Sequence, residues 1–220
     1  MFETIDNYCE RIGDGFWAEP LNAITNLAFI LAAFFSWRLI ARLNQSAPGN
    51  WVLVLLLFSI GVGSGLFHTF ATRWAELADI IPIVLFQLAY LWLYSRNVIR
   101  LKGMGAAGLL VTFVAILAFG FMLNASLGER FEALLAPLNG SGMYAGALIG
   151  VYGLGIYHLK AQTEHRAALL LAALLFTFSL LFRTLDMSLC SQIPFGTHFL
   201  WHMCNAGVLY LSIRAYLYSQ

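Results

Sequence analysis

The stretch that decides the fold is PFGTHFLWHMCN, residues 194–205, at the start of the last long apolar run of the chain. It places His198 and His202 four residues apart, which on an α-helix puts both imidazoles on one face, one turn apart. A histidine inside a membrane-length apolar segment is costly, so two on one face form a candidate functional site. The alternative is a pair of histidines that hydrogen-bond across a polar helix interface, and the pair alone does not choose between the two.

The composition of the chain is that of a membrane protein. Of its 220 residues, 60% are hydrophobic and 10% are charged, whereas soluble domains carry about 25% charged residues. The net charge is +1, with no basic arm or patch, so nothing in the sequence indicates nucleic-acid binding. The N-terminal residues are acidic and lack the basic region that begins a cleavable signal peptide.

Seven apolar stretches alternate with polar loops, and they predict seven transmembrane helices in a single domain over residues 1–220. Each stretch has roughly 17–22 residues, a length that fits a bilayer core about 30 Å thick. The predicted spans are 21–39, 51–70, 78–94, 104–123, 142–159, 167–185 and 197–217. The longest connection, 124–141, contains a short amphipathic piece at 129–135 that Pro137 ends. We therefore predict an all-α membrane bundle without a soluble domain or a second module.

The distribution of basic residues predicts the orientation of this bundle. An odd number of spans places the two termini on opposite sides of the membrane. One side holds eight basic residues, namely Arg38, Arg42, Arg96, Arg100, Lys102, Lys160, Arg166 and Arg214. The other side holds four, namely Arg11, Arg73, Arg130 and Arg183. Because cytoplasmic loops are enriched in Lys and Arg, we expect the N-terminus outside and the C-terminus in the cytoplasm.

Polar side chains from three predicted spans fall at one depth. At 1.5 Å per residue, His68 lies about 25 Å from the start of the second span, near the outer end. Ser64 lies one turn deeper on the same face, and Asp79 opens the third span at that end. The histidine pair of the last span begins at the outer end as well. Five polar side chains are therefore expected within a layer of two helical turns.

Three histidines, a carboxylate and a hydroxyl together indicate metal-dependent hydrolysis. Three neutral imidazoles with an open fourth position are a ligand set of catalytic zinc, which lowers the pKa of its bound water to about 7 and polarises a carbonyl. Asp79 suits a general base or a residue that orients a ligand histidine. The Ser64 hydroxyl suits a donor to an oxyanion or to the metal water. The alternative is that His68 caps the end of its helix and Asp79 caps the start of the next.

The remaining polar residues of the apolar runs have simpler interpretations. His158 and His165 flank a predicted cytoplasmic loop, and we interpret both as solvated. Arg183 and Asp186 lie near the outer end of the sixth span, where they could pair with each other or brace the site. For these two we favour a structural role over a catalytic one. Cys204 lies inside the seventh span and is expected to be a free packing residue.

Three stretches of the sequence resemble motifs of the alkaline ceramidases. GVGSGLFHTFATRWAELADIIP (61–82) resembles their second-helix motif of a serine, a histidine four residues later and an aspartate eleven after that. GTHFLWHMCN (196–205) resembles their last-helix motif H-x-x-x-H, and YCERIGDGFWAEPLNAITN (8–26) resembles their N-terminal motif. The three stretches follow the family's order over the whole chain. The FWAEPLN motif is similar to that of bacterial-type members of the family. The wider superfamily of seven-helix hydrolases includes the adiponectin-receptor-like proteins.

The resemblance implies a zinc-dependent intramembrane amidase that hydrolyses the N-acyl bond of ceramide or a related N-acyl lipid. It implies zinc held by His68, His198 and His202, with zinc-bound water as the nucleophile and Asp79 and Ser64 as the catalytic partners. Fatty acid and sphingoid base would be the products. The partner would be a membrane lipid. The protein would be a multi-pass integral membrane protein, in the plasma or inner membrane if it is bacterial. The alternative is a zinc-containing receptor or sensor of the adiponectin-receptor type with weak or no hydrolase activity.

The resemblance also implies a calcium ion in the acidic N-terminal segment, residues 1–20, packed on the site side of the bundle. Calcium binds six to eight oxygens, including carboxylates and carbonyls. The implied ligands are Glu10 and Glu19, with further oxygens from Asp6, Asp14 and Asn22. The alternative is an acidic segment that is only solvated. The family's pattern further implies a disulfide between Cys9 and Cys190, which both fall on the predicted outer side, where oxidation is permitted.

Overall fold

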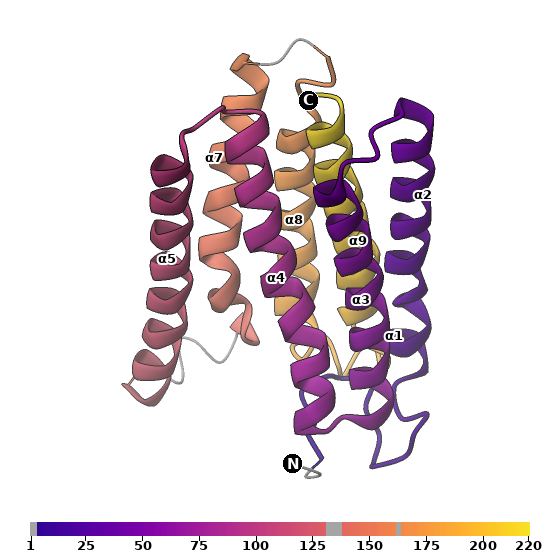
Figure 1. Cartoon of the computed structure of the whole chain (residues 1–220). Helices are drawn as coiled ribbons and strands as arrows, with labels where there is room; N and C mark the ends of the chain where they lie inside the picture. Colours follow the sequence, from indigo (N-terminus) through magenta and orange to yellow (C-terminus); the bar gives the residue numbers. More distant parts are fainter. Residues whose placement is uncertain (1–3, 131–137, 162–163) are drawn as a thin grey trace.

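The computed structural model describes residues 4–130, 138–161 and 164–220, and the regular secondary structure of these residues is helical, with one isolated β-bridge between Thr4 and Thr72. The α-helices are α1 (Pro20–Thr25), α2 (Leu27–Leu43), α3 (Pro48–Phe70), α4 (Arg73–Asn97), α5 (Gly103–Arg130), α7 (Ala145–Ala161), α8 (Ala168–Leu185) and α9 (His198–Leu217). A short 3-10 helix, η2 (Ser141–Tyr144), precedes α7. The helices form one bundle, with α2 and α5 on its two sides and the termini at opposite ends (Figure 1).

The long helices of the described residues fit a membrane protein. Four segments there are long and apolar enough to cross a membrane, namely Pro20–Leu43, Pro48–Phe70, Arg73–Asn97 and Ala168–Leu185. Within α5, a shorter apolar helical part covers Gly103–Phe119. In α9, polar side chains such as His198, His202 and Arg214 lower the mean hydropathy of an otherwise apolar helix.

The observed helices follow the predicted spans, with two clear differences. The helix α4 begins at Arg73, five residues before the predicted start at residue 78, so Asp79 lies inside α4 and does not cap it. The second difference is in α5. The sequence predicts that the fourth span ends at residue 123 and that a connection follows, but α5 continues to Arg130. The prediction for 124–130 was wrong because this stretch contains no proline, and an established helix gains one hydrogen bond for each residue that it adds. The predicted amphipathic piece at 129–135 lies mostly outside the described residues.

His158 is buried, and the prediction that it is solvated was wrong. The helix α7 continues past it to Ala161, and the imidazole lies 2.7 Å from the hydroxyl of Tyr94 on α4 (Nδ1 to Oη). Its relative exposure is 0%. Sequence position near the end of a span did not show which face of α7 His158 occupies. His165, four residues beyond the end of α7, is exposed as predicted.

The close approach of α3 and α4 depends on a glycine. A Cβ atom added at Gly63 would collide with the carbonyl oxygen of Ala78 on α4. Small residues commonly permit such close contacts between membrane helices. Because Ser64 and Asp79 are the next residues on the two helices, this contact places them at the same level in the bundle.

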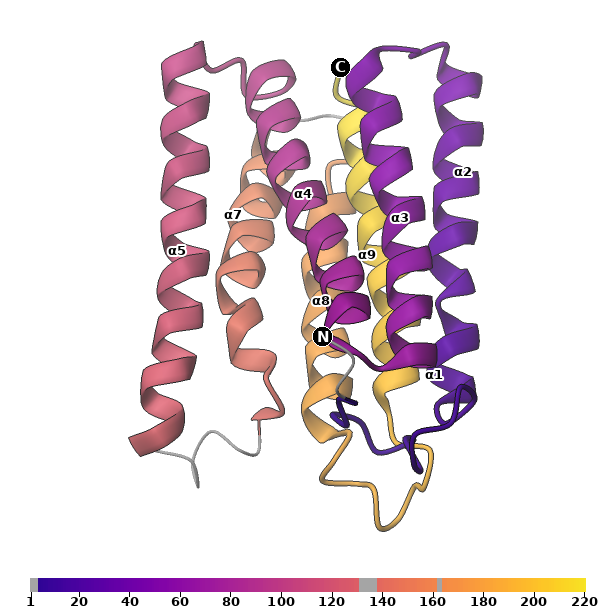
Figure 2. The ribbon, with the colours of Figure 1, turned by 60° about the horizontal axis from the view of Figure 1, so that its bottom comes forward.

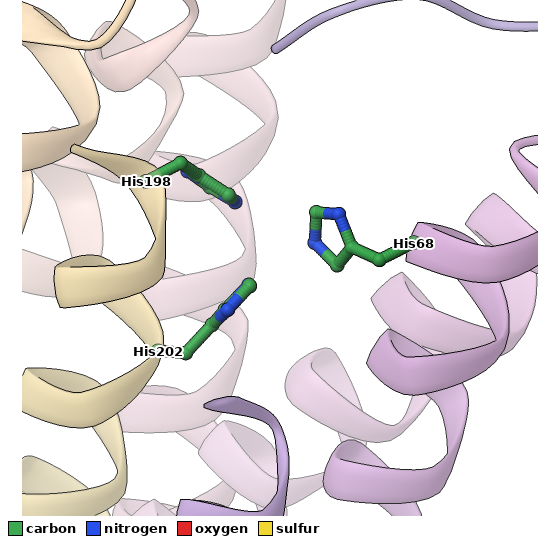
Figure 3. Close-up of side chains that lie close together, drawn as sticks. All are labelled: His68, His198 and His202. Carbon is green, nitrogen blue, oxygen red and sulfur yellow. The ribbon is translucent and has the colours of Figure 1, made fainter. Parts of the chain in front are cut away.

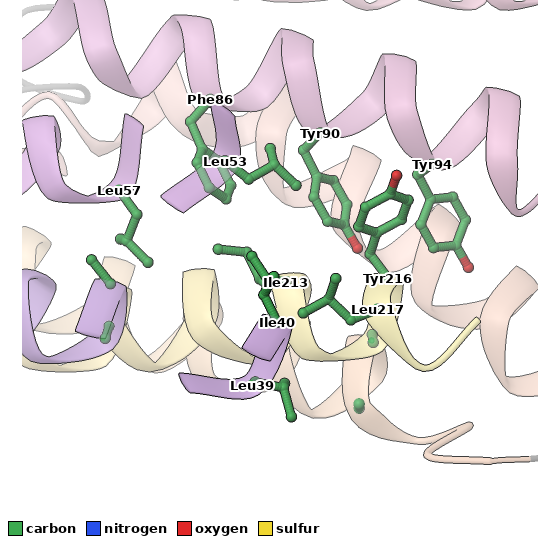
Figure 4. Packing of buried hydrophobic residues seen from close by; sticks show 14 of the residues in the cluster. Leu39, Ile40, Leu53, Leu57, Phe86, Tyr90, Tyr94, Ile213, Tyr216 and Leu217 are labelled. Carbon is green, nitrogen blue, oxygen red and sulfur yellow. The ribbon is translucent and has the colours of Figure 1, made fainter. Parts of the chain in front are cut away.

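The hydrophobic core fills the half of the bundle away from the N-terminal segment. Figure 4 shows side chains of α2, α3, α4 and α9 packed together there, among them Leu53, Leu57, Phe86, Ile213 and Leu217. Three tyrosines in this core are hydrogen-bonded. Tyr94 pairs with His158, Tyr90 donates to the carbonyl of Ser212 at 3.0 Å, and Tyr216 accepts from Asn97 at 2.6 Å. The apolar core thus leaves the other end of the bundle for polar residues.

We predict that Gly63→Ala lowers the stability of the protein by about 1–3 kcal/mol, the usual cost of an overpacked site. The effect opposes the higher helix propensity of alanine, which alone would favour the variant by up to about 1 kcal/mol. The measurement is the thermal unfolding midpoint in detergent. The matched control is Gly65→Ala, because the nearest atom to its new Cβ is the Cβ of Asn26 at 4.0 Å. Equal midpoints for the two variants would contradict the role of the Gly63 contact.

Candidate metal centre

Three buried histidines converge at the end of the bundle that carries the N-terminal segment. His68 comes from α3, and His198 and His202 come from successive turns of α9, with their rings pointing toward one another (Figure 3). One ring nitrogen of each lies within 4.8 Å of the others, and each residue is 1% exposed. In residues 4–130, 138–161 and 164–220, these histidines are the one group of three or more His, Cys, Asp or Glu with ligand atoms this close together. The three histidines could therefore hold a metal ion.

Two ring nitrogens of this group are buried without a hydrogen-bond partner in the described part of the chain. They are Nδ1 of His198 and Nε2 of His202. Buried polar groups in proteins almost always have a partner, and a group without one requires an explanation such as an ion. A metal ion between the three rings would satisfy both nitrogens, so these residues fit a metal.

Two of the rings are oriented by oxygen atoms on the side away from the centre. Nδ1 of His68 lies 2.6 Å from a carboxylate oxygen of Glu19, and Nδ1 of His202 lies 3.0 Å from the hydroxyl of Thr25. The Thr25 hydroxyl donates to the carbonyl of Leu21 at 2.7 Å, which leaves its lone pairs free to accept from His202. Metal-binding histidines typically use their second nitrogen in this way, and the partner orients the ring. The Nε2 atoms of both histidines are then available at the centre.

The third ring, that of His198, is held by aromatic stacking. The ring of Tyr8 lies 3.8 Å from it at an interplanar angle of 20°, and Trp201 stacks on it at 6.2 Å and 18°. Burial raises the pKa of Tyr8 to about 12 although the neighbouring Arg183 acts to lower it, so this phenol is neutral near pH 7. The N-terminal segment therefore contacts the centre directly through Tyr8.

Asp186 holds the start of α9 in place. Its buried carboxylate accepts from the backbone N–H groups of Thr197 at 2.7 Å, His198 at 2.9 Å and Cys9 at 3.0 Å. The first N–H groups of a helix lack partners within the helix, and a carboxylate there is also favoured by the helix dipole. Gly196 must be a glycine here, because its φ is +62° and an added Cβ would collide with Asp186. Asp186 thus positions His198 without touching the imidazole.

The N-terminal segment and the loop between α8 and α9 are joined covalently. Cys9 and Cys190 form a disulfide with a Cα–Cα distance of 5.4 Å, the pairing that the resemblance implied. Figure 2 shows both segments at the same end of the bundle. Cys204 on α9 is a free thiol.

The two glutamates that the resemblance implies as calcium ligands accept hydrogen bonds within the chain. The Glu10 carboxylate accepts from the backbone N–H groups of Leu21 at 2.7 Å and Asn22 at 2.8 Å, in the first turn of α1. The Glu19 carboxylate is hydrogen-bonded to His68, and it accepts from the side-chain amide of Asn22 at 3.0 Å and from the guanidinium of Arg11 at 2.5 Å. The side chains of Asp6 and Asp14 are exposed.

Arg11 places a positive charge beside Glu19. Arg11 is 6% exposed and donates to the carbonyls of Gly13 and His68, both at 3.3 Å. Burial acts to raise the pKa of Glu19, but hydrogen bonds from His68 and Asn22 and the charge of Arg11 hold it below its usual value. The carboxylate that orients His68 is therefore ionised near pH 7.

Ser64 and Asp79 line a cavity of about 240 Å³ together with His198 and His202. From His198 the cavity extends to Ser212, about 21 Å along α9 at 1.5 Å per residue. Beyond the histidines its walls are mostly apolar, with residues that include Ile60, Phe86, Leu91, Val208 and Leu209. A polar centre thus opens into a long apolar channel.

The chain has membrane-length apolar helices, a buried three-histidine centre and an adjoining apolar channel. These features fit a helical membrane protein with a candidate metal site. The model of the Ceramidase family matches residues 4–220, nearly the full chain, and the chain belongs to this family. This confirms the resemblance to ceramidases, and membership implies a hydrolase that acts on amide bonds. None of the curated proteins matches the chain.

We predict that Glu19→Gln weakens metal binding by about 10–100-fold, because the ring of His68 loses its charged partner. The measurement is metal affinity by competition with a chromogenic chelator, together with the thermal midpoint to verify folding. Asp14→Asn is the matched control, since it removes an exposed carboxylate from the same segment. An affinity within twofold of the wild-type value would show that Glu19 does not support the centre.

We also predict that calcium has no effect on this protein, since Arg11 neutralises Glu19. Neither millimolar calcium nor a calcium-selective chelator should change the thermal midpoint, and calorimetric titration should detect no calcium binding. A rise in midpoint with calcium that disappears in Glu10→Gln would contradict this prediction.

Proposed function

We propose that this protein is a zinc-dependent amidase that acts within a membrane and hydrolyses the N-acyl bond of ceramide or a related N-acyl lipid. The observation that carries the proposal is the convergence of His68, His198 and His202 beside Ser64 and Asp79 at the polar end of an apolar channel. Membership of the Ceramidase family supports the reaction class. Free fatty acid and a sphingoid base would be the products.

The three imidazoles have the donor chemistry of a catalytic zinc site with an open fourth position. Zinc bound there would activate a water and polarise the amide carbonyl. Asp79 lines the same cavity as the histidines of α9, and it accepts the proton of the attacking water before returning it to the leaving nitrogen. The Ser64 hydroxyl donates to the oxygen that becomes negatively charged in the transition state.

The acyl chain of the substrate occupies the apolar part of the channel. Each buried CH₂ group contributes about 0.8 kcal/mol, so a long chain binds there much more tightly than a short one. The amide then lies at the level of the histidines, and the amine side of the lipid lies toward the N-terminal segment. This arrangement favours a long-chain N-acyl lipid over a small soluble amide.

The proposed membrane arrangement has seven spans, in one domain, with the N-terminus outside and the C-terminus in the cytoplasm. The short α1 and α2 together make the first span, and α3, α4, α5, α7, α8 and α9 make the other six. The disulfide at the N-terminal end supports an oxidising environment on that side. The excess of Lys and Arg at the opposite end supports the same orientation, in a plasma or bacterial inner membrane.

The test is hydrolysis of C16 ceramide by the purified protein, with and without a zinc chelator. We expect release of palmitate only with metal, and a loss of about 10²-fold or more in Asp79→Asn, because general acid–base groups contribute about 10²–10⁴-fold. His202→Ala should lose both metal and activity. His165→Ala is the control, since this histidine is exposed. Full activity in both site variants would refute the mechanism, whereas ceramide binding without hydrolysis would favour a receptor.

A further inference from the structure

Arg183 is a cation beside the metal centre to which the proposed mechanism gives no role. It lies in the last turn of α8 and lines the same cavity as Asp79 and His198. One guanidinium nitrogen donates to the hydroxyl of Tyr8 at 3.0 Å. Through Tyr8, which stacks on His198, the guanidinium is one residue away from the centre.

Aromatic rings surround this guanidinium on several sides. Its carbon lies 5.5 Å from the ring centroids of Tyr8 and Tyr144 and 5.4 Å from that of Trp201. Cation–π contacts of this kind hold a charge in place and compensate part of its lost hydration. They supply no oxygen atoms to its N–H groups.

Among the side chains that the structure describes, no carboxylate lies within 4 Å of the Arg183 guanidinium, and Asp79 in the same cavity is a carboxylate that interacts with it over a longer distance. The ion pairs within 4 Å there are Arg11–Glu19, His68–Glu19 and Arg73–Glu76. Asp186, three residues further along, uses its carboxylate on three backbone N–H groups. A guanidinium has five N–H donors, and Nε of Arg183 is buried without a hydrogen-bond partner in this part of the chain.

The Arg183 side chain is half-buried, but its Nε is buried at the cavity without a hydrogen-bond partner among the described residues, and such a donor calls for a ligand. The planar fork of a guanidinium matches two oxygens of a carboxylate or phosphate. Arg183 lies at the polar end of the cavity, near Tyr8, whereas the apolar channel runs toward Ser212. A bound lipid would therefore present the polar group on its amine side, and not its acyl chain, to Arg183.

We propose that Arg183 recognises an anionic oxygen group, a phosphate or a carboxylate, on the amine side of the N-acyl lipid that enters this cavity. The inference rests on the proposed amidase function and narrows its substrate class. An N-acyl lipid with an acidic head group would be preferred over neutral ceramide. Arg183 would then set substrate specificity, in addition to holding Tyr8.

The experiment compares three C16 lipids in mixed micelles: ceramide, ceramide 1-phosphate and N-palmitoylglycine. We expect the wild type to have a kcat/KM at least tenfold higher for one of the two anionic lipids than for ceramide. In Arg183→Gln this ratio should fall by about 10–150-fold, the range for lost hydrogen bonds to a charged group. Arg183→Lys should restore part of the ratio, because it keeps the charge but not the fork.

The matched control is Arg73→Gln, which removes one positive charge at the same end of the bundle from a side chain that is 65% exposed. It should leave the ratio unchanged, and metal content and thermal midpoint verify that each variant is folded. A wild type without preference for either anionic lipid would overturn the inference. An equal loss of kcat/KM for all three lipids in Arg183→Gln would also overturn it.

Failure of the proposed function can be separated from failure of this inference. If the wild type hydrolyses none of the three lipids, the amidase proposal fails. Equilibrium binding of the same lipids, followed by tryptophan fluorescence, then tests Arg183 alone. Tighter binding of an anionic lipid that Arg183→Gln abolishes would support the inference, and equal binding of all three lipids would refute it.

Discussion

The hydrogen bond between Glu19 and His68 is the interaction on which the metal centre depends most. It joins a loop at the start of the chain to a helix 49 residues later, at 2.6 Å and with both groups nearly inaccessible. A carboxylate buried to this degree is strongly destabilising unless it is paired. Arg11 provides that pairing from within the same segment, so Arg11, Glu19 and His68 form a single buried unit that orients one of the three rings.

A second carboxylate, Asp186, positions a histidine of α9, as Glu19 positions the histidine of α3. It binds the backbone where α9 begins and, at the same time, the amide of Cys9. The adjacent disulfide joins residues 181 positions apart, and such a link restricts the unfolded chain strongly. The N-terminal segment is therefore part of the site in three ways: it orients His68, stacks on His198 and is attached to the loop before α9.

The bundle separates two environments along its length. Apolar side chains and a few hydrogen-bonded tyrosines fill one half, and the buried charged side chains and the three histidines gather in the other. The cavity connects the two, with Asp79, Arg183 and the histidines at its polar end and apolar walls beyond. Charged groups in such a low-dielectric site interact more strongly than in water, which suits both amide hydrolysis and the recognition of a charged lipid group.

The sequence by itself determined the helices and the level at which the polar residues meet. Apolar runs of membrane length predict the helices because backbone groups in an apolar environment must bond within the helix. Helical rise and periodicity then place His68, Ser64, Asp79 and the pair His198–His202 at one end. These quantities depend on local chain geometry, so they can be read from residue spacing.

Only the tertiary structure decided which partner each buried polar group uses. Arg11 appeared in the sequence as one basic residue among acidic ones, yet in the structure it pairs with the buried carboxylate of Glu19. Asp186 reaches an amide 177 residues away, and His158 faces Tyr94 rather than water. Such pairings depend on contacts between distant segments and on which helix face is buried, and residue spacing along one helix contains no information about either.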